Sequence, residues 1–130
     1  MKQNLEILIV TRSVALGQGL GALLESLPGI TRVKAIQGLT SAYAWIEAHL
    51  PKIVLLDEDI LGRSPEAVLE KIRSLSPHTR RALLANDIQQ VSLLLTYAEA
   101  VLIKGTQPSV IAWTITNLLS TKGDEHVTEK

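Results

Sequence analysis

Five short apolar runs punctuate the sequence, and segments with helical spacing of apolar residues separate them. The run from Ile53 to Leu56 is uninterrupted by polar residues and leads directly into Asp57. Such a run is typical of a strand that is buried on both faces, as in a parallel sheet covered by helices. The pattern therefore predicts five strands, within residues 5–10, 33–36, 51–57, 81–85 and 101–103.

Helix signals follow every predicted strand. Ser13 and Thr40 are candidate caps for the first two helices, and Ser64-Pro65 is a typical start for the third. The fourth helix is predicted over residues 87–97, and Pro108 opens the last. Five alternations of strand and helix with short connections predict an α/β domain: a flavodoxin-like, doubly wound parallel sheet with strand order 2-1-3-4-5 and five helices.

Length and composition restrict the possible functions. The 130 residues suit one domain, expected over residues 1–120, with residues 121–130 as a polar tail or the start of a linker. Thirteen basic residues balance thirteen acidic ones, which argues against direct nucleic-acid binding. The first apolar run is too short for a signal peptide or a membrane span, and there is no cysteine. We expect a cytoplasmic protein with no membrane contact.

Four pieces of the sequence, taken in order and spacing, resemble the receiver domain of two-component response regulators. They are Ile7-Leu8-Ile9-Val10, the stretch LLESLPG at residues 23–29, the stretch PKIVLLD at residues 51–57, and Leu102-Ile103-Lys104-Gly105. The resemblance runs from residue 5 to residue 120 and is nearest to receivers that precede a LuxR-type helix-turn-helix domain. It implies a CheY-like fold, Asp57 at the phospho-acceptor position, Lys104 as the lysine that contacts the phosphoryl group, and a histidine kinase or another signalling protein as a partner.

The sequence departs from the receiver pattern at the positions on which phosphorylation depends. Thr11 and Arg12 replace the acidic pair that holds Mg²⁺, and Ala85 replaces the hydroxyl residue that senses phosphate. Val101 replaces the switch aromatic, and Leu61 replaces a loop proline. Mg²⁺ needs carboxylates to neutralise the charge of a phosphoryl donor. We therefore expect no cofactor, and we expect Mg²⁺-dependent phosphorylation to be impaired or absent.

The residues around the acceptor position leave several interpretations open. Asp57 is either a phospho-acceptor or, as we favour, a carboxylate held in a structural ion pair. Asp59 could reach the same pocket and help to hold Mg²⁺, and Asn86 is placed in the pocket as well. Arg12 could pair with Asp57 or hold a small anion beside Lys104, but a solvated arginine is the interpretation that we favour.

The last predicted helix carries an unusual exposed face. Ile111 and Ile115 lie on one stripe, whereas Trp113 lies almost opposite, with Val110 beside it. Leu95 in the fourth helix corresponds to a position that is usually polar. Tryptophan is enriched in interface hot spots. We therefore predict a homodimer through the face formed by the fourth helix, the fifth strand and the last helix.

The sequence gives no support for an enzyme. No serine–histidine–aspartate or cysteine–histidine constellation can be argued, and the three histidines do not have the spacing of metal ligands. The favoured hypothesis is a non-enzymatic pseudo-receiver that acts in two-component signalling by protein contact and dimerisation. The alternatives are a working phospho-acceptor that controls a transcriptional output domain, and a pseudo-receiver that senses a small anion or ligand.

Overall fold

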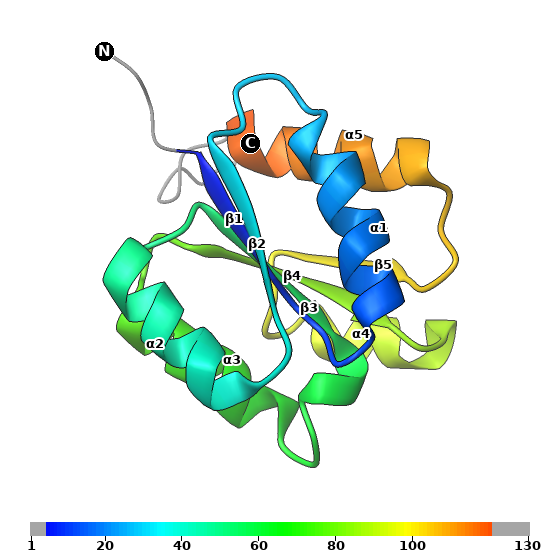
Figure 1. Cartoon of the computed structure of the whole chain (residues 1–130). Helices are drawn as coiled ribbons and strands as arrows, with labels where there is room; N and C mark the ends of the chain where they lie inside the picture. The colour runs from blue at the N-terminus through cyan, green and yellow to red at the C-terminus, as the bar shows by residue number, and fades with distance from the viewer. Residues whose placement is uncertain (1–4, 121–130) are drawn as a thin grey trace, which may run out of the picture.

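The computed structural model describes residues 5–120, which fold around a parallel sheet of five strands (Figure 1). The order of the strands is β2-β1-β3-β4-β5, which confirms the predicted fold class and topology. The strands are β1 (Glu6–Val10), β2 (Arg32–Ile36), β3 (Ile53–Asp57), β4 (Arg80–Ala85) and β5 (Ala100–Ile103).

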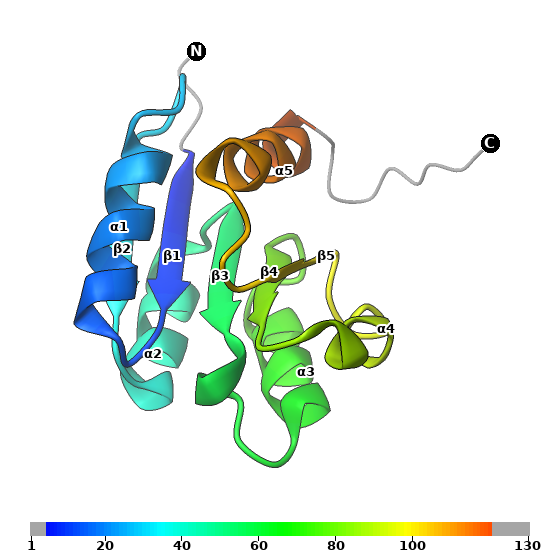
Figure 2. The same ribbon diagram turned by 90° about the vertical axis from the view of Figure 1, so that its right-hand side faces the viewer.

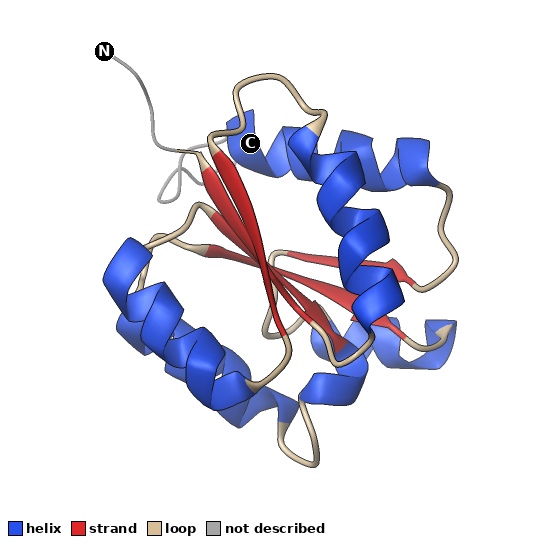
Figure 3. Ribbon diagram, in the orientation of Figure 1, coloured by secondary structure: helices blue, strands red, loops and turns tan. Residues whose placement is uncertain are grey.

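Helices cover both faces of this sheet. Figure 3 shows α1 and α5 on one face and α2, α3 and α4 on the other. The helices are α1 (Val14–Glu25), α2 (Leu39–His49), α3 (Pro65–Leu75), α4 (Val91–Leu94) and α5 (Pro108–Ser120). Short 3₁₀ turns precede α3 and α4, at η1 (Glu58–Ile60) and η2 (Ile88–Gln90).

The central strand β3 is buried along its whole length. Val54 and Leu56 face the core beneath α2 and α3, whereas Ile53 and Leu55 face the core beneath α1 and α5. Successive side chains of a strand point to opposite faces of the sheet, and both faces here are covered. This is why the sequence shows a continuous apolar run that ends in a carboxylate.

Two predicted helix starts differ from the structure in detail. Ser13 caps α1 as predicted, because its hydroxyl oxygen accepts a hydrogen bond from the backbone N–H of Leu16 at 3.1 Å. Thr40 is not a cap: α2 begins one residue before it, and Gly38 in an extended conformation takes the N-cap position. Ser64 stands at the N-cap of α3 but makes no capping hydrogen bond, so Pro65 is the stronger signal there.

The fourth helix is present but shorter than the predicted range of residues 87–97. The Asp87 carboxylate accepts a hydrogen bond from the backbone N–H of Gln89 at 3.0 Å, which begins a 3₁₀ turn, and only four residues of α-helix follow. Of three consecutive leucines, only Leu94 is buried, while Leu93 and Leu95 are exposed. One helical face cannot bury all three, so little packing is available to extend this helix.

Among the helices of residues 5–120, none is both long and apolar enough to cross a membrane. The predicted polar tail, residues 121–130, lies outside the described residues.

Candidate functional site

Asp57 lies at the carboxyl end of β3, between the ends of β1 and β4, and only 5% of its surface is exposed. Its carboxylate accepts three hydrogen bonds. Lys104 Nζ lies 2.5 Å from Oδ1, and the backbone N–H of Asp59 donates to the same oxygen at 3.0 Å. Thr11 Oγ1 donates to Oδ2 at 2.8 Å. Both carboxylate oxygens are therefore already bonded within the protein.

Lys104 reaches this carboxylate from the loop that follows β5. Its backbone N–H donates to the carbonyl of Ala85 at 2.8 Å, and Gly105 at φ +90° then turns the chain away. The ammonium bridges Asp57 and Asp59, which lies 3.0 Å away. Partial burial lowers the pKa of Lys104, but the hydrogen bonds and negative charges of the two aspartates outweigh it, so that the net shift is upward.

Asp59 forms the exposed side of the same cluster. Asn86 Nδ2 donates to Oδ1 of Asp59 at 2.9 Å, and Lys104 binds Oδ2. These hydrogen bonds, first that of Asn86 and then that of Lys104, together with the charge of Lys104, lower the pKa of Asp59. The backbone N–H of Asn86 also donates to Oε1 of Glu58 at 2.7 Å. Sequence reasoning did not single out Glu58, although its place directly after Asp57 was a usable signal.

The suggested ion pair between Arg12 and Asp57 does not form. Thr11 is 2% exposed and directs its hydroxyl to Asp57, so the next side chain, Arg12, is directed outward and is exposed. Within the described part of the chain, Arg12 makes no ion pair, and its charge contributes only the smallest of the effects that lower the pKa of Asp59. This is the solvated arginine that the sequence favoured.

The other departures from the receiver pattern have clear places in the structure. Ala85 ends β4 and is fully buried, and it offers no hydroxyl to the Asp57 cluster. Val101 lies half-buried in the edge strand β5. Leu61 is 3% exposed and packs into the core beneath α2 and α3. Leu61 thus has a packing role of its own.

The donor set at this site does not fit Mg²⁺. Asp57 and Asp59 are its two aspartates, and the Lys104 ammonium lies against both of them. The end of β1 supplies Thr11 and Arg12 in place of carboxylates. Mg²⁺ prefers an octahedral set of oxygen ligands that includes carboxylates. Across residues 5–120, no three His, Cys, Asp or Glu side chains gather in a way that could hold a metal ion.

A second feature lies on the face formed by α4, β5 and α5, which Figure 2 shows edge-on. The predicted interface residues are exposed: Trp113 by 69%, Leu95 by 48% and Val110 by 44%. Ile111 and Ile115 on the opposite side of α5 are buried, as the helical pattern indicated. The structure adds two exposed residues in and before α4 that were not among the predicted interface residues, Ile88 and Leu93.

Comparison with known proteins identifies the fold. No protein-family model matches the chain, and no curated protein matches its sequence. Among solved structures, the receiver domain of a CheY-like response regulator from Methylobacillus flagellatus superposes with a TM-score of 0.77 at 16% identity, covering 89% of this chain and 99% of that one. The chain has the receiver fold. The predicted resemblance is thereby confirmed for the fold.

Two further structures illustrate the range of proteins with this receiver fold. A signal receiver domain described as that of the response regulator NarL from Mycobacterium tuberculosis has a TM-score of 0.75 at 21% identity, over 92% of this chain and 99% of that one. A protein from Burkholderia thailandensis that is described as a pilus assembly protein has a TM-score of 0.75 at 16% identity, over 90% and 99%.

Proposed function

We propose that this domain is a pseudo-receiver of two-component signalling, which acts through protein contacts without Mg²⁺-dependent phosphorylation of Asp57. The observation that carries the proposal is the state of the Asp57 carboxylate. Three donors, from Thr11, Asp59 and Lys104, occupy three of the roughly four acceptor sites on its two oxygens. Phosphoryl transfer to a carboxylate requires an oxygen that is free to attack and a cation that neutralises the incoming charge. Here a lysine already pairs with the acceptor.

Two further positions, at the end of β4 and in β5, support the proposal that phosphorylation is not the signal here. In the receiver pattern a hydroxyl residue at the end of β4 senses phosphate, and Ala85 stands there. The switch aromatic is replaced by Val101, whose short side chain cannot rotate between a buried and an exposed position as a ring can. The resemblance of the fold to pilus assembly proteins agrees with a domain that works through protein contacts.

Incubation with acetyl phosphate and Mg²⁺, read by intact mass, tests this proposal. We expect no phosphoryl adduct on the wild-type domain, while a phospho-accepting receiver domain run in parallel becomes modified. Asp57→Asn is the matched control for non-specific modification. An adduct on the wild type that is absent from Asp57→Asn would contradict the proposal.

That contrary result would favour the second candidate, a working phospho-acceptor in which Asp59 helps to hold Mg²⁺. One observation supports this candidate: Asp59 shares Lys104 with Asp57, so its carboxylate lies close to the acceptor position. Phosphorylation by this route would require Lys104 to give up its contact with Asp59. Asp59→Asn should then lower the fraction of the domain that carries the phosphoryl adduct.

The proposed mode of contact is self-association through the α4–β5–α5 face. A stable interface needs about 1,200 Å² of buried surface in total, and a tryptophan at its centre contributes about 2 kcal/mol or more. We expect Trp113→Ala to weaken the dimer about thirtyfold while the fold is retained. Sedimentation measures this change.

The control for the dimer experiment is Leu50→Ala, an exposed apolar residue at the end of α2, outside the proposed face. It should leave the association unchanged. A wild-type domain that stays monomeric at high concentration, or a Trp113→Ala dimer as tight as the wild type, would contradict the assignment of this face.

A further inference from the structure

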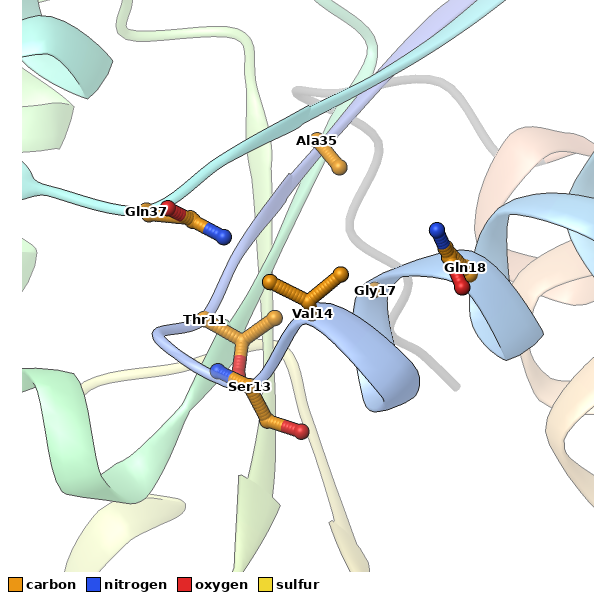
Figure 4. Close-up of a pocket in the computed structure, with 7 residues that line it drawn as sticks. All are labelled: Thr11, Ser13, Val14, Gly17, Gln18, Ala35 and Gln37. Carbon is orange, nitrogen blue, oxygen red and sulfur yellow. The ribbon is translucent and has the colours of Figure 1, made fainter.

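A cavity of about 320 Å³ opens beside the Asp57 cluster, between the start of α1 and the end of β2. Figure 4 shows its walls: Val14, Gly17 and Gln18 come from α1, and Ala35 and Gln37 come from β2 and the residue after it. Gly17 keeps the space between the helix and the edge strand open. A Cβ atom at this position would lie 3.5 Å from Thr11 Cγ2 and 3.6 Å from Ala35 Cβ.

The chemistry of the lining points to an uncharged ligand. Among the described residues that line the cavity, none carries a charge. The carboxamides of Gln18 and Gln37 approach the space from opposite sides (Figure 4). A carboxamide both donates and accepts hydrogen bonds, so its best partner is a group that does the same, such as another amide. Val14, Ala35 and the Thr11 methyl group supply apolar surface between them.

We propose that this cavity binds a small uncharged molecule in which a flat ring carries an amide or forms part of a cyclic amide. The volume is at the lower end of the range of small-molecule sites, which suits a single ring with its substituent. The ring would lie on the apolar surface while its amide group bonds to Gln18 and Gln37.

Thr11 connects the cavity to Asp57. Its methyl group lines the cavity, and its hydroxyl donates to Asp57 Oδ2 at 2.8 Å. Oγ1 of Thr11 also accepts a hydrogen bond from the backbone N–H of Ser13, another lining residue, at 3.1 Å. A ligand that contacts Thr11 and Ser13 therefore changes the hydrogen bonds that hold Asp57. We call this effect of the ligand on Asp57 the relay. The relay rests on the proposed function, in which Asp57 has a structural role, whereas the binding of the ligand in the cavity does not rest on it.

Benzamide and benzoate form a matched pair of probes, because they share a ring and differ in charge. We would titrate each into the ¹⁵N-labelled domain and follow amide and side-chain NH₂ resonances. We expect benzamide to give saturable shifts at Gly17, Gln18 and Gln37, with a dissociation constant in the millimolar range typical of so small a ligand. Benzoate should bind at least about tenfold more weakly, since its carboxylate can only accept hydrogen bonds.

Two glycines of α1 provide a matched pair of variants. Gly17→Ala places a methyl group on the wall of the cavity in ordinary contact with its neighbours, whereas a Cβ at Gly19 meets nothing within 4 Å. Both changes favour the helix equally. We expect Gly17→Ala to weaken benzamide binding about tenfold through steric overlap, and Gly19→Ala to leave it unchanged. Asp57→Ala leaves the walls of the cavity unchanged and removes the acceptor of the Thr11 hydroxyl.

The outcomes separate the parts of the proposal. Absence of saturable shifts, equal binding by Gly17→Ala, or binding of benzoate as tight as that of benzamide would overturn the site. In the wild type, benzamide should also shift the Lys104 amide, and in Asp57→Ala this distant shift should disappear while binding persists. A Lys104 shift that persists in Asp57→Ala would overturn the relay alone. Intact-mass phosphorylation tests the proposed function separately.

Discussion

The contact between Lys104 and Asp57 predicts a large loss of stability on removal of the lysine charge. Lys104→Met retains most of the length and apolar character of the side chain but removes the ammonium. Asp57, 5% exposed, would keep its bonds from Thr11 and Asp59 and lose its counter-charge at 2.5 Å. The exposed Asp59 can turn to water, so the effect should come almost entirely from Asp57.

The magnitude follows from burial. Breaking a buried ion pair by removing one partner typically costs about 3–5 kcal/mol. The side chain of Lys104 is 27% exposed, so solvent screens part of its charge, and we expect a loss of about 2–3 kcal/mol at pH 7. For a domain of this size the melting temperature should fall by roughly 10 °C. Urea unfolding at pH 7 measures the free energy directly.

A double-mutant cycle isolates the pair. In an Asp57→Asn background, Lys104→Met should cost less than about 1 kcal/mol, because no buried carboxylate is left without its partner. Lys34→Met, an exposed lysine on β2, is the control for loss of a positive charge and should change stability by less than about 0.5 kcal/mol. Equal stability of Lys104→Met and wild type, or the same loss in both backgrounds, would refute the reasoning.

Two further predictions concern pH and backbone strain. The pKa of Lys104 is raised on folding, so protonated Lys104 stabilises the folded domain. This contribution to the free energy of unfolding is complete below the unfolded-state pKa of about 10.4 and is lost as the pH rises through the folded-state pKa. Thermal melts in alkaline buffers should show the loss for the wild type, and the loss should be absent from Lys104→Met. Leu50 adopts φ 49° at the end of α2, a left-handed conformation that is strained for leucine and easier for asparagine. Leu50→Asn should therefore raise the free energy of unfolding by up to about 1 kcal/mol. An unchanged or lower value in urea unfolding would contradict the strain.

The sequence was sufficient for the fold because its apolar pattern records which faces are covered. Ile53 to Leu56 is apolar throughout since helices lie on both sides of β3. The pattern did not predict the length of the fourth helix, because any one of three consecutive leucines could lie on its buried face. Which of them is buried depends on packing against β5, and sequence periodicity does not contain that information.

The site was predictable in its positions and not in its contacts. The carboxyl ends of parallel strands meet at one edge of the sheet, so Asp57 and Lys104 could be placed together from the sequence. The direction of the Arg12 side chain could not be predicted, because the sequence does not show whether Thr11 or Arg12 points towards Asp57 after the end of β1. Two hydrogen bonds were unpredictable for the same reason, since they join residues far apart in the sequence. The Thr11 hydroxyl donates to Asp57, and the backbone N–H of Asn86 donates to Glu58.

The position of Lys104 relates the cluster to the proposed interface. Lys104 begins the loop between β5 and α5, and its ammonium holds the start of that loop against the end of β3. Trp113 lies on the helix that this loop introduces. Asp57 and Asp59 supply the negative charge that the Lys104 ammonium contacts. Under the proposed function this contact holds the loop without phosphorylation, and we expect the α4–β5–α5 face to be a constitutive interaction surface.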